Sequence, residues 1–510
     1  MRFPPGKPMS PLSLRPGRSS PGWAALVLMG LFFSPVLEAA RGAERHGERP
    51  PNIVFILADD LGYGDLGCLG QEIVRTPRLD RMADEGMILT DFYAGSTVCA
   101  PSRSVFITGQ HTGRTRIRGN RSASGERVPL RPEDPNVARM LYEAGYSTGA
   151  VGKWGLGEAG SPGIPNRQGF GYWFGFLNQG RAHTYYPDWI WRNEVRYDLT
   201  GNWDGARGLY VHDLFTAEAL AFIRAHRDQP FFLYLPYTIP HAEIAAPEDS
   251  LEEYAGRFEE TYFPGRGNYA AQEQPRAAFA AMVTRMDRDV GALLDLLDEL
   301  DLAGNTLVLF SSDNGAHREG GADPEFFGSS GPLRGIKRDL YEGGIRVPTL
   351  AWWPGRIAPG TVSDHVADFA DFLPTAAELA GLEPPAGIDG VSFLPALLGE
   401  PERQQQRPYL YWEFYEQGSS QAVRRGDWKA VRRPAFSGPI ELYDLATDLG
   451  EAQDVAAEHP EVVAEMERIM AEAHEPDPLW QPAGRTPAPP PPGSGELPEV
   501  LRQRMAAGGE

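Results

Sequence analysis

A run of seven mostly apolar residues that ends in two adjacent carboxylates constrains the fold of this chain more than any other feature. Residues 52–58 are Asn-Ile-Val-Phe-Ile-Leu-Ala, and Asp59 and Asp60 follow them directly. A continuous apolar run of this length is typical of a strand that is buried on both faces, as in a parallel sheet between two layers of helices. Because open α/β sheets build their sites at the carboxyl ends of strands, the two aspartates mark a candidate site.

Further apolar runs alternate with helix-like segments along the chain, which predicts an α/β fold with a large, mostly parallel sheet flanked by helices. The expected strands are 52–58, 146–151, 230–237, 306–311 and 347–353. Apolar residues recur at helical spacing in the expected helices, which are 76–86, 137–145, 275–300 and 371–381.

The segment from Gly387 to Pro401 predicts a domain boundary, because glycine and proline interrupt the pattern there. Beyond it, we expect antiparallel strands at 409–414, 421–432 and 440–445 and a helix at 461–474. The prediction is therefore a catalytic domain at 50–400 and a smaller C-terminal α+β domain with an antiparallel sheet at 401–475. The proline-rich remainder, 476–510, is predicted to be a disordered or extended tail.

The amino terminus has the order of a secretory signal, with four basic residues, an apolar run at 23–37 and small residues at 39–40. Residues 1–40 are therefore predicted to be a signal peptide of a secreted or periplasmic protein. The run of 15 residues is shorter than the roughly 20 that a membrane helix needs, so no stable membrane span is expected. An uncleaved anchor is the alternative.

The formal net charge of −21 argues against a partner that is nucleic acid or an anionic membrane. The overall field of such a chain also repels an anionic substrate. A substrate of that kind would have to be held by a local cluster of Lys, Arg or His residues.

A second strand is expected to bring further oxygen ligands to the edge that carries Asp59 and Asp60. Residues 306–312 form another buried run, and Asp313 and Asn314 follow it. If the two strands are neighbours, three carboxylates and one amide oxygen converge. Oxygen ligands of this kind favour Ca²⁺ or Mg²⁺. Zinc is less suited, because histidine or thiolate ligands at the usual spacing are lacking.

The two cysteines, Cys68 and Cys99, allow interpretations that exclude each other. In an exported protein they could form a disulfide. Cys99 also opens the sequence Cys-Ala-Pro-Ser-Arg, which ends at Arg103. There it is either a modified, functional residue or a small buried cysteine at a helix start, with Pro101 in the first turn.

Six motifs resemble those of the sulfatase family in identity and order, and the resemblance covers residues from about 52 to 475. The motifs are Asp59-Asp60, Cys99-Ala-Pro-Ser-Arg103, Gly152-Lys153-Trp154, Pro240-His241, Asp313-Asn314 and Gly335-Ile-Lys337. The resemblance implies an alkaline-phosphatase-like fold and an arylsulfatase-like hydrolase of sulfate esters. It also implies that a formylglycine-generating enzyme converts Cys99 to formylglycine.

The resemblance further implies a role for each matched residue. The implied ligands of the Ca²⁺ or Mg²⁺ ion are Asp59, Asp60, Asp313, Asn314 and the modified Cys99. Arg103 corresponds to the arginine that holds the modified residue. The implied sulfate contacts are Lys153, His241 and Lys337. In this interpretation the metal activates the modified Cys99 as a nucleophile, and His241 or Lys337 protonates the departing alcohol.

One position departs from the family pattern. Members commonly have a histidine directly after Gly-Lys-Trp, whereas this chain has Gly155, which cannot accept a proton. Either another histidine fills the space, with His183 and His317 as candidates, or Lys153 takes the role, or the enzyme is slow. We favour a replacement histidine. The alternative for either candidate is a hydrogen-bonded structural imidazole.

Aromatic residues are concentrated between residues 170 and 191, in the segment that contains His183. Aromatic rings stack on sugars, so this segment favours a sulfated carbohydrate as substrate, with Trp189 as a substrate-binding candidate. Core packing is the alternative for about half of these aromatic residues. Two other functions stay open, which are a phosphate or phosphonate monoester hydrolase of the same superfamily and a carbohydrate-binding homologue that has lost turnover.

Overall fold

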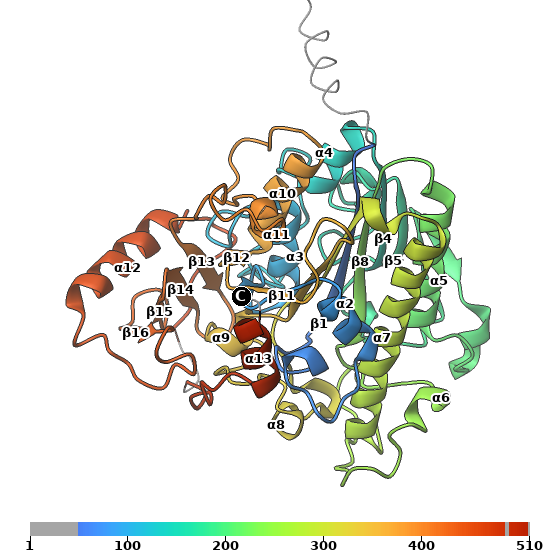
Figure 1. Cartoon of the computed structure of the whole chain (residues 1–510). Coiled ribbons are helices and arrows are strands. Elements are labelled where there is room, and N and C mark those ends of the chain that lie inside the picture. Colours follow the sequence, from blue (N-terminus) through green and yellow to red (C-terminus); the bar gives the residue numbers. More distant parts are fainter. Residues whose placement is uncertain (1–48, 485–488, 508–510) are drawn as a thin grey trace, which may run out of the picture. The chain divides into compact units, whose positions relative to one another are not determined.

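The computed structural model describes residues 49–484 and 489–507, and the predicted signal peptide at 1–40 lies outside the described residues. The described residues belong to one compact unit. It contains a ten-stranded sheet, a four-stranded sheet and a pair of short strands, β3 (Phe92–Tyr93) and β12 (Ala367–Asp368). Helices pack against both of the larger sheets (Figure 1).

The first apolar run forms β1 (Asn52–Asp59) at the centre of the large sheet. It lies between β8 (Phe231–Pro240) and β9 (Thr306–Ser312), and both neighbours run parallel to it. β4 (Ser147–Lys153) and β5 (Tyr172–Phe176) continue the parallel order beyond β8. The carboxyl ends of β1, β8 and β9 therefore meet at one edge of the sheet.

Antiparallel pairing occurs towards both ends of this sheet. One end is the hairpin of β6 (Trp189–Arg192) and β7 (Val195–Asp198). At the other end β10 (Thr349–Trp352) runs antiparallel to β9 and to β2 (Met87–Leu89), and β11 (Thr361–Ser363) is the last strand.

Alternate side chains of β1 pack into two hydrophobic clusters on opposite faces of the sheet. Val54, Ile56 and Ala58 belong to one cluster. Ile53, Phe55 and Leu57 belong to the other. This alternation explains why an unbroken apolar run can form a strand that is buried on both faces.

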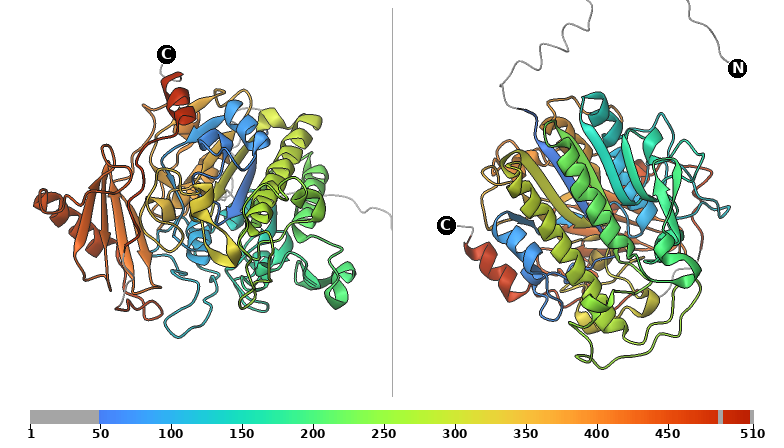
Figure 2. Two further views of the ribbon diagram at one scale, coloured as in Figure 1. Left: turned by 90° about the horizontal axis from the view of Figure 1, so that it is seen from below. Right: turned by 90° about the vertical axis from the view of Figure 1, so that its right-hand side faces the viewer.

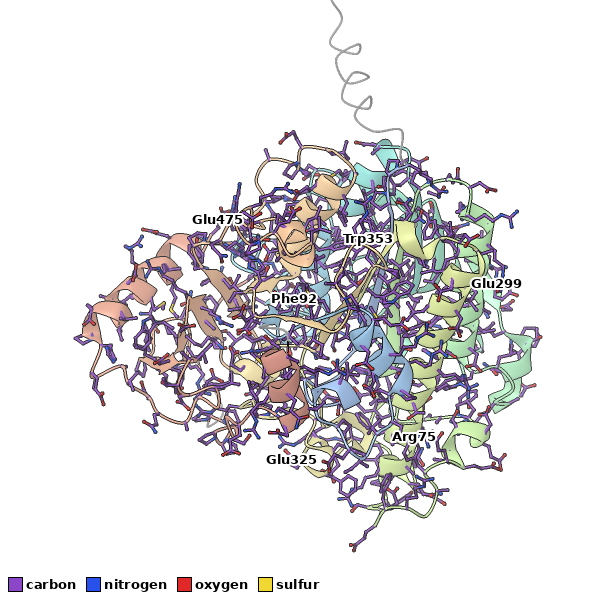
Figure 3. The ribbon with its side chains drawn as sticks, viewed as in Figure 1. Arg75, Phe92, Glu299, Glu325, Trp353 and Glu475 are labelled. Carbon is purple, nitrogen blue, oxygen red and sulfur yellow. The ribbon has the colours of Figure 1, made fainter. Side chains whose placement is uncertain are left out.

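Helices form a layer over each face, and side chains fill the space between the layers (Figures 2 and 3). The first cluster takes in α2 (Pro77–Asp84), α5 (Val211–His226) and α7 (Pro275–Glu299). The second takes in α3 (Cys99–Thr108), α4 (Val137–Glu143), α10 (Phe372–Leu379) and α11 (Leu394–Leu397). The shorter helices are α6 (Glu248–Leu251), α8 (Pro324–Phe327) and α9 (Glu342–Ile345).

The second sheet is antiparallel and carries one long helix. Its strands are β13 (Leu410–Phe414), β14 (Ser420–Arg425), β15 (Trp428–Arg432) and β16 (Ile440–Asp444), with α12 (Pro460–Ala473) packed on them. Trp412 of β13 donates from Nε1 to the carbonyl oxygen of Ala94 at 2.9 Å, which ties this sheet to the residues before α3.

The structure confirms the predicted α/β class, the mostly parallel sheet and the small antiparallel sheet near the C-terminus. Several details differ from the predictions, among them β2, β5, β6, β7 and β11, which were not expected. The expected strand at 421–432 is two strands, because the chain turns at Gly426, which has a φ of +60°. Helix α5 was not predicted, although its buried residues Val211, Phe215, Ala219 and Phe222 recur at helical spacing.

The described part of the proline-rich tail also differs from the disordered or extended segment that was expected. It ends in α13 (Glu499–Ala507), whose Leu501 is fully buried. Of the apolar residues of this helix only Leu501 is buried, and Met505 one turn later is exposed, so the sequence pattern is too weak to predict docking. Within 49–484 and 489–507, no helix combines the length and apolar character that a membrane span requires.

Candidate active site

Three carboxylates and one amide meet where β1 and β9 end side by side. The backbone N–H of Asp60 donates to Asp313 Oδ1 at 3.1 Å, and Asn314 Nδ2 donates to Asp60 Oδ1 at 2.7 Å. Asp59 completes the group, and all four side chains are fully buried. The strand order makes this meeting possible, because Ala58 pairs with Ser312 in the parallel ladder.

Cys99 is the first residue of α3 and lies against these carboxylates. One ligand atom each from Asp59, Cys99 and Asp313 lies within 4.8 Å of the other two, and the same holds for Asp60, Cys99 and His241. Burial raises the pKa of the Cys99 thiol to about 12, so the unmodified side chain is a neutral thiol at pH 7 and a poor nucleophile. Cys68 and Cys99 are both buried and free, so the possible disulfide is not formed.

Three buried cations neutralise the carboxylates. Arg103 donates from Nε and Nη2 to Asp313 Oδ2 at 3.0 and 2.7 Å. Lys153 Nζ lies 2.6 Å from Asp59 Oδ2, and Lys337 Nζ lies 2.7 Å from Asp60 Oδ2. Burial alone would lower the pKa of both lysines, but the adjacent carboxylates raise it above the usual value, so both stay charged.

The donor set fits a hard divalent cation. Asn314 Oδ1 is buried and has no hydrogen-bond partner among the described residues, although such an atom is costly to leave unpaired. Burial, and then the charge of the neighbouring Asp59, raises the pKa of Asp313 to about 7. Three carboxylates and one amide oxygen suit Ca²⁺ or Mg²⁺.

Three histidines form a stack beside this cluster. The ring centroids of His183 and His241 are 4.6 Å apart with planes at 18°, and those of His241 and His317 are 5.7 Å apart at 11°. His241 Nδ1 lies 2.6 Å from the carbonyl oxygen of Ala242, and its Nε2 lies 3.5 Å from Asp60 Oδ2. Burial, followed by the charge of Lys337, keeps the pKa of His241 well below its usual value.

His317 and His183 differ in how they are held. His317 has partners at both ring nitrogens, with Nε2 3.1 Å from the carbonyl oxygen of Pro240 and Nδ1 3.0 Å from Glu319 Oε2. His183 lies on the connection between β5 and β6 and is only partly buried. Burial, followed by the charges of Lys153 and Lys337, lowers the pKa of His183 to about 3.

Gln179 occupies the space beside Gly155. A Cβ atom at position 155 would lie 2.9 Å from Gln179 Nε2, and Gly155 has a φ of +83°. A histidine at this position would therefore need both a left-handed backbone and a displaced Gln179.

Trp189 packs outside the catalytic cluster. The guanidinium carbons of Arg181 and Arg196 lie 3.8 and 4.9 Å from the centre of its ring, and Trp191 packs edge-on against it. Other aromatic residues of this segment are core residues, as the alternative interpretation held for about half of them. They include Phe170, Trp173, Phe174 and Tyr185.

The structure brings together most of the residues that the sequence predicted for the site. They are Asp59, Asp60, Cys99, Arg103, Lys153, His183, His241, Asp313, Asn314, His317 and Lys337. Sequence reasoning missed Glu319, which contacts His317 and lies 3.6 Å from Lys337 Nζ. Its position five residues after Asn314, in the same loop, was the available signal.

Comparison with known families places two matches along this chain. A model described as Sulfatase matches residues 51–382, and one described as N-sulphoglucosamine sulphohydrolase, C-terminal, matches residues 336–475. The N-acetylgalactosamine-6-sulfatase of Canis lupus familiaris is 34% identical over 440 residues, which cover 82% of this chain and 77% of that protein. Arylsulfatase A of Homo sapiens is 33% identical over 488 residues, which cover 83% and 87%.

A solved structure shares the same fold. The crystal structure of Ps i-CgsB superposes with a TM-score of 0.73 at 28% sequence identity and covers 85% of this chain and 95% of that one. A second structure of Ps i-CgsB is a complex with k-i-k-neocarrahexaose.

Proposed function

The chain belongs to the sulfatase family and is a sulfate ester hydrolase, and from this premise we propose that its substrate is a carbohydrate sulfate ester. We further propose that its nucleophile is a formylglycine made from Cys99 and that its cofactor is Ca²⁺ or Mg²⁺. The convergence of Cys99 with Asp59, Asp60 and Asp313 is the single observation that carries this proposal.

The divalent cation, when bound, would supply Lewis acidity, which lowers the pKa of a coordinated hydroxyl and withdraws charge from a sulfate oxygen. The residues that would hold it are Asp59, Asp60, Asp313 and Asn314. Arg103 positions this set, because it donates to Asp313 and also to the carbonyl oxygen of Lys153 at 2.6 Å.

Lys153 and Lys337 would bind the sulfate group. Both are buried, charged and close enough to Cys99 to affect its pKa, so their ammonium groups can neutralise charge on sulfate oxygens in a site that excludes water. Of the two predicted proton donors to the departing alcohol oxygen, Lys337 is better suited, because it stays charged beside Asp60, whereas the lowered pKa of His241 leaves its imidazole neutral at pH 7.

Gly155 stands where family members commonly have a proton-accepting histidine. We assign that role to His183. His183 stacks on His241, and its imidazole is unprotonated at pH 7, so one ring nitrogen has a lone pair that can accept a hydrogen bond. His317 is less suited to this role, because both of its ring nitrogens already have partners.

The names of the relatives support a carbohydrate as substrate. One relative is an N-acetylgalactosamine-6-sulfatase, and Ps i-CgsB has been crystallised with an oligosaccharide. Trp189 stays a candidate sugar contact because its ring is half-buried, although Arg181 and Arg196 lie over that ring. The order of residues 1–40 supports secretion or a periplasmic location. The proposed nucleophile also requires a formylglycine-generating enzyme as a partner.

Mass spectrometry of the peptide that contains residue 99, combined with hydrolysis assays, tests this proposal. Protein made together with a formylglycine-generating enzyme should carry an aldehyde at position 99 and release sulfate from sugar sulfates. Cys99→Ser should abolish hydrolysis, whereas Cys68→Ala removes the other buried thiol and should retain it. An intact thiol at position 99 in active protein would contradict the proposed nucleophile.

The same assays separate the remaining alternatives. A phosphate or phosphonate monoester hydrolase would process an aryl phosphate faster than the matched aryl sulfate. A carbohydrate-binding homologue without turnover would bind a sugar sulfate and release no sulfate even with the aldehyde in place. Cleavage of aryl sulfates without any sugar sulfate would contradict the proposed substrate class.

A further inference from the structure

A cavity of 670 Å³ lies beside the catalytic cluster, and part of the C-terminal segment forms one of its walls. His317 and Lys337 are among the lining residues, so the cavity reaches the lysine that pairs with Asp60. Residues 490–494 line it as well. Its volume lies within the range of roughly 300–1,000 Å³ that is usual for ligand pockets.

Residues 490–495, which we call the proline wall, are anchored by a buried arginine. Arg334 Nε donates to the carbonyl oxygen of Pro490 at 2.8 Å. Its Nη1 donates to the carbonyl oxygen of Glu451 at 2.8 Å and to the Tyr443 hydroxyl at 2.9 Å. The guanidinium group therefore joins the proline wall to the small antiparallel sheet.

Backbone contacts hold the other end of the proline wall. The N–H of Gly493 donates to the carbonyl oxygen of Gly450, and that of Gly495 donates to the carbonyl oxygen of Pro332, each at 2.9 Å. A Cβ atom on Gly493 would lie 2.3 Å from the backbone oxygen of Pro332, so only glycine allows these two backbone segments to approach so closely. Beyond the proline wall, helix α13 packs on the protein through buried Leu501.

The charges around the cavity balance. Three cations and three carboxylates line it, which are Arg318, Lys337 and Arg338 against Glu319, Glu325 and Asp339. Glu325, labelled in Figure 3, lies on α8 at one side of this site. Since Lys337 is already committed to Asp60, the lining offers no surplus positive charge to a second anion. The cavity therefore suits a neutral, polar ligand.

The chemistry of the proline wall fits a sugar. Prolines 490–492 bring apolar rings to the lining of the cavity, and proline has no N–H. A pyranose ring has C–H faces that can make apolar contacts. Hydroxyl groups at its edge can donate hydrogen bonds to carbonyl oxygens. The charged side chains across the cavity supply further partners for hydroxyl groups.

We propose that the proline wall determines specificity, because it contacts the neutral sugar that is joined to the sulfated unit of the substrate. This proposal rests on the proposed carbohydrate sulfatase function. It places the sulfate beside Lys337 and the adjoining sugar between the proline wall and Arg338. The wall therefore discriminates between substrates that carry such a sugar and substrates that do not.

Substitution of Pro491 by Trp tests the proposal in the full-length, aldehyde-bearing protein. Pro491 is exposed, so the larger side chain narrows the cavity with little effect on folding. Pro489→Trp is the matched control, because residue 489 is also exposed and does not line the cavity. The probes are para-nitrophenyl sulfate, N-acetylgalactosamine 6-sulfate and a trisaccharide that carries this sulfated unit at one end.

We expect P491W to lower kcat/KM for the trisaccharide at least about tenfold and to leave kcat/KM for para-nitrophenyl sulfate within about twofold. The monosaccharide should behave like the aryl sulfate, and P489W should behave like the wild type. An equal loss on all three substrates would overturn the proposal, because it would indicate damage to the catalytic centre. No loss on the trisaccharide would overturn it as well.

Failure of the proposed function can be distinguished from failure of this inference. If the wild type hydrolyses para-nitrophenyl sulfate but no sugar sulfate, the proposed substrate class is wrong. The wall is then tested by inhibition, with the trisaccharide as competitor of para-nitrophenyl sulfate. Weaker inhibition of P491W than of the wild type would support a saccharide site, whereas absence of inhibition of the wild type would overturn it.

Discussion

The imidazole of His183 stacks on that of His241, with ring centroids 4.6 Å apart and planes inclined by 18°. His241 follows β8 directly, whereas His183 comes from the connection between β5 and β6. The stack therefore brings a residue from a loop to a group that the end of a central strand positions. It supplies an imidazole to a site in which Gly155 provides none.

Replacement of His183 by Ala should lower kcat by about 10²- to 10⁴-fold, the usual contribution of general acid–base catalysis. The imidazole is neutral at pH 7, and alanine has no group that accepts a proton. Steady-state assays with para-nitrophenyl sulfate measure the effect. His459→Ala serves as control. His459 is half-exposed and lies directly before α12, so its replacement should leave kcat unchanged. Unchanged kcat in H183A would refute the assigned role.

Removal of divalent cations should lower both activity and the melting temperature. Asp59, Asp60 and Asp313 repel one another in a buried site, and a bound cation relieves this repulsion only in the folded state. Ligand at about 100 times its Kd adds roughly 2.7 kcal/mol to the free energy of unfolding. Thermal unfolding after chelation, and after addition of Ca²⁺ or Mg²⁺, measures the change.

The control for this experiment is Asp313→Asn, which removes one charged ligand. Its melting temperature should respond less to added divalent cations than that of the wild type. Sodium chloride at equal ionic strength should not reproduce the effect. An identical response of wild type and D313N would place the cation site elsewhere.

The ligand cluster was predictable from the sequence because its signals are local. An apolar strand followed by Asp59-Asp60, and another followed by Asp313-Asn314, require only that β1 and β9 are neighbours. The parallel α/β pattern favours such a neighbourhood, although it does not specify strand order. The periodicity of α7 was equally local, and the predicted helix ends within one residue of the observed one.

The parts that were not predicted depend on loops and on contacts between distant segments. Glu319 reaches His317 and Lys337 only because the loop after β9 folds back on itself. The proline wall docks through Arg334 and through the close approach of Gly493 to Pro332, and proline-rich composition alone predicts neither contact. Long-range backbone packing of this kind leaves no periodic pattern in the sequence.

Asp287 should make the protein less stable as the pH rises from about 4 to 7. It lies on α7 and accepts hydrogen bonds from the N–H groups of Arg78 and Leu79 at the start of α2. Burial raises its pKa to about 7 from an ordinary value of 3.8. Between these values the unfolded chain has lost a proton that the folded chain retains, so stability falls with increasing pH.

The variant Asp287→Asn cannot titrate and should lack this component of the pH dependence. Its melting temperature should lie furthest below that of the wild type at about pH 4, and the difference should shrink as the pH rises to about 7. Thermal unfolding of both proteins at several pH values measures the difference. A difference that grows with pH would show that the folded state favours the ionised carboxylate instead.

Substitution of Lys429 by Met should lower the free energy of unfolding by about 3–5 kcal/mol, the usual cost of removing one partner from a buried ion pair. Lys429 Nζ lies 2.8 Å from Glu342 Oε1 and 3.4 Å from Glu451 Oε1, and all three residues are fully buried. Methionine preserves volume but leaves Glu342 without its main counter-charge. Arg468→Ala, which breaks an exposed pair with Glu472 on α12, is the matched control and should change the melting temperature little. Equal melting temperatures for K429M and the wild type would mean that Glu342 is neutral in the folded protein.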